Sequence, residues 1–152
     1  MAQQPQRMVI TREDIERLIE ERNSLTALLD ALRQNLALVT QSLSELSGAK
    51  DMLTILNKGE VQDTYANIGG GVFIKALPAQ GEKVLVGVGA NYVIEMDINY
   101  AINYIGDRIK EIEDLKSKLE SQSAEIAKRV TDIDNFLLYI SQAVRQQQQS
   151  QG

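Results

Sequence analysis

The sequence has 152 residues, with 16 Lys and Arg against 21 Asp and Glu, a net charge of −5, and neither His nor Cys. The lack of a basic block argues against a nucleic-acid partner. The lack of thiols and imidazoles removes disulfides, soft metal ligands and the usual general base near neutral pH. We therefore expect no enzyme, no metal site and no cofactor. No run of about 18 apolar residues predicts a membrane span, and we expect a cytoplasmic protein.

The first predicted element is a long helix over residues 11–57, after a flexible tail at 1–10. Thr11 and Asp14 have capping-box spacing, Ile10 and Ile15 fit a hydrophobic staple, and Gly59 is suited to close the helix. An unbroken heptad seam runs through Ile15, Leu18, Arg22, Leu25, Leu29, Leu32, Leu36, Val39, Leu43, Leu46, Lys50 and Leu53. Because only Arg22 and Lys50 are polar, the seam predicts a left-handed coiled coil. A register-setting role is expected for Arg22 and for Lys116 on the second seam described below.

Residues 58–97 change to a two-residue period, which predicts short strands over 64–68, 72–77, 84–89 and 92–97. The turns are expected at Gly69-Gly70-Gly71 and Gly89-Ala90-Asn91. Because residues 68–75 resemble residues 88–95, twenty positions later, the segment is expected to form two β-hairpins.

These strands carry apolar side chains on both faces and have no partner layer of their own, so we expect other chains to cover them. The residues expected in this oligomerisation interface are Ile68, Val72, Phe73, Ile74, Val84, Val86, Val88, Tyr92 and Ile94.

A second helix is predicted over residues 98–145, with Asp97 as its cap, followed by a disordered Gln-rich tail at 146–152. Its seam consists of Ile98, Ile102, Ile105, Ile109, Ile112, Lys116, Leu119, Ser123, Ile126, Val130, Ile133, Leu137, Ile140 and Val144. Two seams of matched length predict an antiparallel coiled-coil hairpin within one chain, with Leu53 opposite Ile98. Gly48 and Gly106 then lie at similar levels, where they allow either close packing of backbones or a flexible joint.

The order helix, two hairpins, helix resembles the alpha class of prefoldin subunits of the archaeal type. Its most specific segments are residues 70–76 and 84–90. The fold class is thus α+β, mainly α: a long antiparallel coiled-coil hairpin with two β-hairpins inserted between the helices. The resemblance implies a hexamer of two alpha and four beta subunits, in which the hairpins assemble into a β-barrel core.

The resemblance also implies an ATP-independent chaperone, or holdase, that binds unfolded polypeptides at the distal coiled-coil tips and delivers them to a group II chaperonin. The candidate client-binding residues are Met8, Val9, Phe136, Leu138, Tyr139, Ile140 and Val144. For Ile140 and Val144, packing in the coiled-coil core is the competing explanation. A structural coiled-coil adaptor for a dedicated folded partner and a self-assembling filament subunit stay open as alternative functions.

Overall fold

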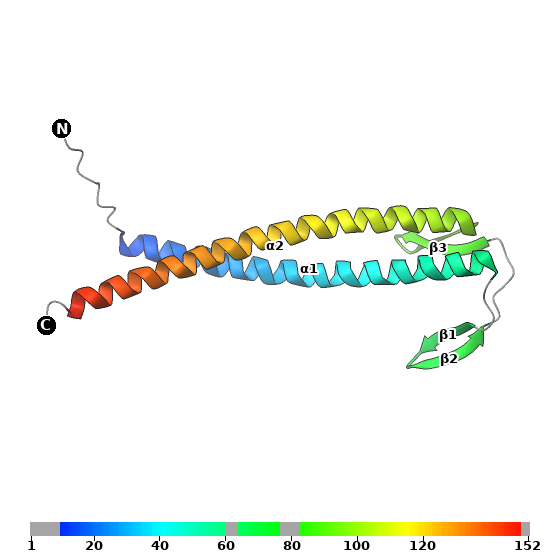
Figure 1. The fold of residues 1–152 in the computed structure, drawn as a ribbon, viewed down its shortest axis with the longest axis horizontal. Helices are drawn as coiled ribbons and strands as arrows, with labels where there is room; N and C mark the ends of the chain where they lie inside the picture. The colour runs from blue at the N-terminus through cyan, green and yellow to red at the C-terminus, as the bar shows by residue number, and fades with distance from the viewer. Residues whose placement is uncertain (1–9, 60–63, 77–82, 150–152) are drawn as a thin grey trace, which may run out of the picture. The chain divides into compact units, whose positions relative to one another are not determined.

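The computed structural model describes residues 10–59, 64–76 and 83–149, and Figure 1 shows its elements in chain order. They are α1 (Arg12–Lys58), β1 (Thr64–Gly69), β2 (Val72–Ala76), β3 (Lys83–Gly89), β4 (Tyr92–Asp97) and α2 (Ile98–Gln149). The predicted fold class, two long helices with two β-hairpins between them, is confirmed. The helix end expected at residue 145 is wrong, because α2 continues to Gln149 through residues assigned to the disordered tail.

The chain divides into two compact units, which we describe separately. The terminal unit comprises residues 1–37 and 117–152, and the central unit comprises residues 38–116. Each unit contains a stretch of α1 and a stretch of α2, and the central unit also contains both hairpins.

The capping box and the terminal glycine predicted for α1 are both present. The Thr11 amide donates to Asp14 Oδ2 at 3.0 Å, and the Asp14 amide donates to Thr11 Oγ1 at 3.2 Å, which completes a reciprocal capping box. The Thr11 hydroxyl also donates to Asp14 Oδ2, at 2.7 Å, and the hydrogen bonds from the Thr11 hydroxyl and amide hold the pKa of Asp14 below its ordinary value of 3.8. At the other end, Gly59 has φ +69° and its amide donates to the Leu56 carbonyl at 3.1 Å. Glycine is favoured there because other residues rarely adopt this left-handed backbone.

The heptad seams are the buried stripes of both helices. Every predicted seam position of α1 is buried or half-buried, and so is every one of α2 except Val144, which is exposed. Leu29, Leu32 and Ile133 are buried in the terminal unit, as are Ile98, Ala101 and Ile105 in the central unit. Ala101 lies beside the seam, and the heptad pattern alone did not predict its burial.

The register of the two helices differs from the predicted one by about one helical turn. We expected Ile98 opposite Leu53, but in the central unit Asn57 Nδ2 donates to Asn99 Oδ1 at 2.8 Å. Apolar spacing every seven residues is satisfied by several registers, so the side-chain amides give information that the apolar pattern does not.

The two candidate joint glycines differ in their surroundings. A Cβ on Gly106 would lie 3.4 Å from Lys50 Nζ, so this glycine faces a seam side chain, whereas a Cβ on Gly48 would meet no atom within 4 Å. Lys50 Nζ is the end of a flexible side chain and 3.4 Å is an ordinary contact distance, so close packing of backbones explains neither glycine.

The two hairpins share one backbone plan. In each, a two-residue turn joins antiparallel strands, and all four turn residues have positive φ: Gly70 and Gly71 in the first hairpin, Ala90 and Asn91 in the second. Each register also shifts at a β-bulge just before the turn, between Asn67 and Gly69 in β1 and between Gly87 and Gly89 in β3. The internal repeat seen in the sequence is therefore a repeat of strand register, turn and bulge.

Candidate functional site

The β1–β2 hairpin exposes apolar side chains on both faces. Ile74 pairs with Ala66 on one face, and Phe73 pairs with Asn67 on the other. The exposed fractions are 51% for Ile74 and 59% for Phe73, and Ile68, Val72 and Tyr65 are exposed as well. A two-stranded sheet with such faces is marginally stable alone, so this hairpin has the properties of an unpartnered contact surface.

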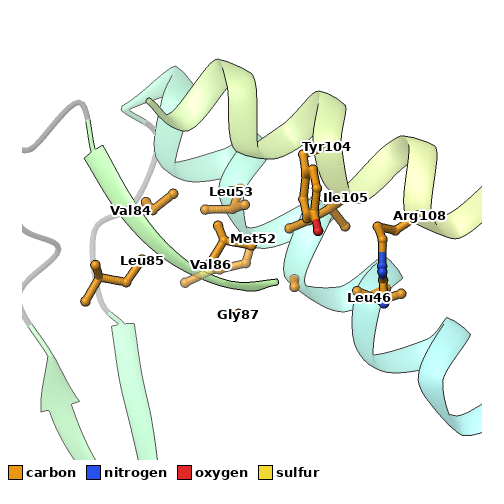
Figure 2. A pocket seen from close by; sticks show the side chains of 11 residues that line it. Leu46, Met52, Leu53, Val84, Leu85, Val86, Gly87, Tyr104, Ile105 and Arg108 are labelled. Carbon is orange, nitrogen blue, oxygen red and sulfur yellow. The ribbon is translucent and has the colours of Figure 1, made fainter. Parts of the chain in front are cut away.

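The β3–β4 hairpin behaves differently, because one of its faces is turned toward the helices of its own unit. Val84, Val86 and Val88 are half-buried in alternation with exposed residues, and Leu85 is 73% exposed. Figure 2 shows Val84 and Val86 pointing toward Leu53 and Met52, while Leu85 points away. Strand β3 and the adjacent parts of α1 and α2 line an apolar cavity of about 450 Å³. Its lining residues are Leu46, Ala49, Met52, Leu53, Val84, Leu85, Val86, Gly87, Tyr104, Ile105 and Arg108.

The predicted interface residues therefore form two groups. Six of them are exposed: Ile68, Val72, Phe73, Ile74, Tyr92 and Ile94. Val84, Val86 and Val88 instead lie on the face of β3 that packs toward the unit's own helices. Sequence reasoning missed the exposed Tyr65, Leu85 and Val93. The signal for them was in the sequence, since apolar residues fill both alternating sets of strand positions.

In the terminal unit, four of the predicted client-binding residues are exposed and close together in α2. Tyr139 is 68% exposed and Leu138 57%, and Phe136 and Val144 are exposed too, while Ile140 is half-buried at its seam position. Ile10, before α1, is also exposed. Met8 and Val9 lie outside the described residues. The α2 part of the predicted set, with the exception of Ile140, thus forms an exposed apolar stretch.

Two ion pairs link α1 to α2 in the terminal unit. Arg22 Nε donates to Asp134 Oδ1 at 2.7 Å, and Arg129 donates to both Glu21 oxygens, Nε to Oε1 at 2.8 Å and Nη2 to Oε2 at 3.1 Å. The hydrogen bond from Arg129 holds the pKa of Glu21 below its ordinary value of 4.5 and raises that of Arg129. The sequence marked Arg22 as a polar seam residue, but gave no signal for its partner, because Asp134 lies 112 positions away.

The described residues contain no group of three or more acidic side chains arranged to hold a metal ion. No described helix is both long enough and apolar enough to span a membrane.

The chain matches the family model described as "Prefoldin subunit" over residues 12–142. It is 35% identical over 128 residues to "Prefoldin subunit alpha" of Pyrobaculum aerophilum, covering 84% of this chain and 96% of that one. It is 29% identical to the protein of the same name from Pyrococcus horikoshii, covering 83% of this chain and 86% of the relative. A solved structure, filamentous PFD from Methanocaldococcus jannaschii, covers 82% of this chain and 98% of its own at 26% identity, with a TM-score of 0.43.

Proposed function

Because the chain belongs to the prefoldin subunit family, as a protein similar to its alpha subunits, we propose that it serves as a holdase. In this function it binds unfolded polypeptides without ATP, at the end of the coiled coil formed by the start of α1 and the end of α2. The exposed apolar stretch of α2 carries the proposal, because non-native chains offer apolar side chains that such a surface can cover.

The chemistry of that stretch fits a weak and unselective binder. Leu138 and Tyr139 lie off the heptad seam, so the coiled coil has no need of them for its own core. Each contact with a client would remove apolar surface from water, worth about 25 cal/mol per Å². A single end supplies few such contacts, so we expect holding to depend on several chains acting together.

We further propose that the hairpins assemble this chain with beta subunits, two alpha with four beta, into a β-barrel core. The exposure of Phe73 and Ile74 on opposite faces of one hairpin supports this assignment. Delivery of clients to a group II chaperonin completes the proposed function.

The holding function is tested with the variant Leu138→Ser and Tyr139→Ser in the full-length chain assembled with beta subunits. The measurement is suppression of aggregation of a chemically unfolded protein, at equal molar ratios and without ATP. Because both side chains are exposed and off the seam, we expect normal assembly and a clear loss of holding, about twofold or more.

The matched control is Leu38→Ser, which removes a leucine with 64% exposure from α1 in the central unit. The assay uses beta subunits whose own coiled-coil ends are removed, so that client binding by the beta subunits does not mask the loss of holding. Equal holding by the Leu138→Ser/Tyr139→Ser variant and the control would contradict the proposal and favour the adaptor function. Native mass spectrometry with and without beta subunits separates a hexamer from a filament subunit.

A further inference from the structure

The terminal unit has a break in its apolar seam at the level of Arg22. Among the described α1 seam positions of this unit, Arg22 is the charged one, and the others are Ile or Leu. A charged residue at such a position interrupts knobs-into-holes packing and lowers stability in exchange for a defined register. The break therefore divides the seam of the unit into an inner part and an outer part.

Burial differs between these two parts. On the inner side, Leu29 and Leu32 are buried, and at the break Ile133 has only 2% of its surface exposed. On the outer side, from residue 21 back to residue 10 and from 135 to 149, no described residue is buried. The outer segment, defined here as residues 12–20 together with 135–145, is thus held by half-buried contacts only.

The two cross-helix ion pairs stand at the boundary. Glu21 and Arg22 are consecutive in α1, and their partners Arg129 and Asp134 lie on either side of Ile133 in α2. Asp134 follows the seam residue Ile133 by one position and Arg129 precedes the seam residue Val130 by one, which places them on opposite edges of the α2 seam. The two helices are therefore tied along both edges of the seam within residues 129–134 of α2, around the most buried side chain of the unit.

We propose that Glu21, Arg22, Arg129 and Asp134 form an ion-pair clasp that confines opening of the coiled coil to the outer segment. This inference rests on the proposed holding function. When the outer segment opens, the seam side chains of Ile15, Leu18, Leu137 and Ile140 join Leu138 and Tyr139 as client-binding surface. The inner seam stays closed, because opening past the clasp breaks both ion pairs at once and then exposes Ile133 and Leu29.

The ion pairs of the clasp are half-exposed, which suits a boundary between the part of the coiled coil that opens and the part that stays closed. Exposed pairs contribute little to global stability, so their value lies in the position at which they act. They are also screened by salt, and the boundary should therefore weaken as ionic strength rises.

The test is amide hydrogen exchange of the full-length chain assembled with beta subunits, with and without an unfolded client protein. In the native protein we expect the client to change exchange in the outer segment and to leave residues 23–36 and 119–133 unchanged. Replacing Glu21→Gln together with Asp134→Asn should raise client-free exchange in those inner residues by about three- to tenfold. High salt should do the same to the native protein.

Three further variants make the test specific. Glu21→Arg alone should behave like the broken clasp, and Glu21→Arg with Arg129→Glu should restore the boundary. Asp30→Asn removes an acidic partner from a pair within α1, Arg33–Asp30 at 3.4 Å, and should leave the boundary in place. Arg22→Leu makes the seam continuous, so exchange in the outer segment should slow and holding should fall although Leu138 and Tyr139 are intact.

The clasp is overturned if the Glu21→Gln/Asp134→Asn variant keeps the native exchange pattern, or if Arg22→Leu changes neither exchange in the outer segment nor holding. Exchange measured without a client protein decides whether the clasp exists, whatever the client-binding function of the chain. A client that leaves the exchange of the native outer segment unchanged instead contradicts the holding function, so the two failures are distinguishable.

Discussion

The two hairpins of the central unit have the same backbone and different surroundings. Strand register, turn length and bulge position coincide when β1–β2 is shifted by twenty residues onto β3–β4. Strands β2 and β4 are exposed alike, but Val88 of β3 is half-buried where the equivalent Ile68 of β1 is exposed, and β3 lines the apolar cavity beside the helices. Local sequence thus determines the hairpin conformation, while its burial depends on what lies beside it.

Side-chain size at equivalent positions accounts for part of this difference. Val84 and Val86 correspond to Thr64 and Ala66, so the second hairpin presents larger aliphatic groups on the face that packs against its own helices. In the first hairpin, Ile74 is the large side chain on the equivalent face, and Tyr65 and Phe73 lie on the other face. A hairpin that buries little surface within its own chain is free to contribute to an interface with another.

The largest expected effect comes from the exposed hairpin. Replacing Phe73→Asp and Ile74→Asp places a carboxylate on each face of β2, where assembly would bury it without a partner. Burial of an unpaired charge costs several kcal/mol, so we expect assembly with beta subunits to weaken about 100-fold or more. Native mass spectrometry across a dilution series measures this weakening.

Two controls accompany that variant. Phe73→Thr with Ile74→Thr keeps strand propensity and should weaken assembly less, and Leu38→Asp on an exposed site of α1 should leave it unchanged. A hexamer of the Asp variant that resists dilution as the native complex does would show that β1–β2 lies outside the interface.

A smaller effect is expected in the second hairpin, from neighbouring residues on opposite faces of one strand. Val86→Asp puts a carboxylate into the apolar cavity against Met52 and Leu53 and should lower the free energy of unfolding of the isolated chain by about 2–3 kcal/mol. Leu85→Asp, at a 73% exposed position, should change it by about 0.5 kcal/mol or less. Denaturant unfolding followed by circular dichroism measures both, and equal losses would mean that β3 does not pack on its own helices.

The smallest effect concerns the turns. Ala90 has φ +47°, a conformation that costs an L-residue with a Cβ about 1–2 kcal/mol, so Ala90→Gly should stabilise the second hairpin by up to about 1 kcal/mol. The reciprocal change, Gly70→Ala, should destabilise the first hairpin by a similar amount, since Gly70 has φ +60°. Amide exchange of the strand residues reports each hairpin separately. Because the two turns share one geometry, Ala90→Gly should stabilise its hairpin and Gly70→Ala should destabilise its own; changes of the same sign would contradict this prediction.

The sequence predicted most of the fold because its signals are local and periodic. The heptad spacing from Ile15 to Leu53 and the strand alternation around Val84 are local, and so is the Thr11–Asp14 capping box. The register of the helices was predicted one turn away from its position, since a repeating apolar seam does not distinguish neighbouring registers as the Asn57–Asn99 hydrogen bond does.

The candidate site was less predictable for the same reason. Exposure of Leu138 and Tyr139 follows from their places off the seam, which the sequence shows. Which face of β3 packs against the helices, and which acidic group meets Arg22, depend on pairing between distant segments. No local pattern contains that information.

The sequence separation of the cross-helix bonds has a consequence for how the chain folds. Asn57 and Asn99 are 42 positions apart, whereas Arg22 and Asp134 are 112 apart. Closing a loop costs about 0.6 kcal/mol more for each doubling of its length, so pairing should start near the hairpins and proceed toward the chain ends. At about 5–20 residues per second, a ribosome needs several seconds between making Arg22 and making its partner. During synthesis, the first helix of this proposed chaperone subunit is therefore itself an unpaired apolar segment.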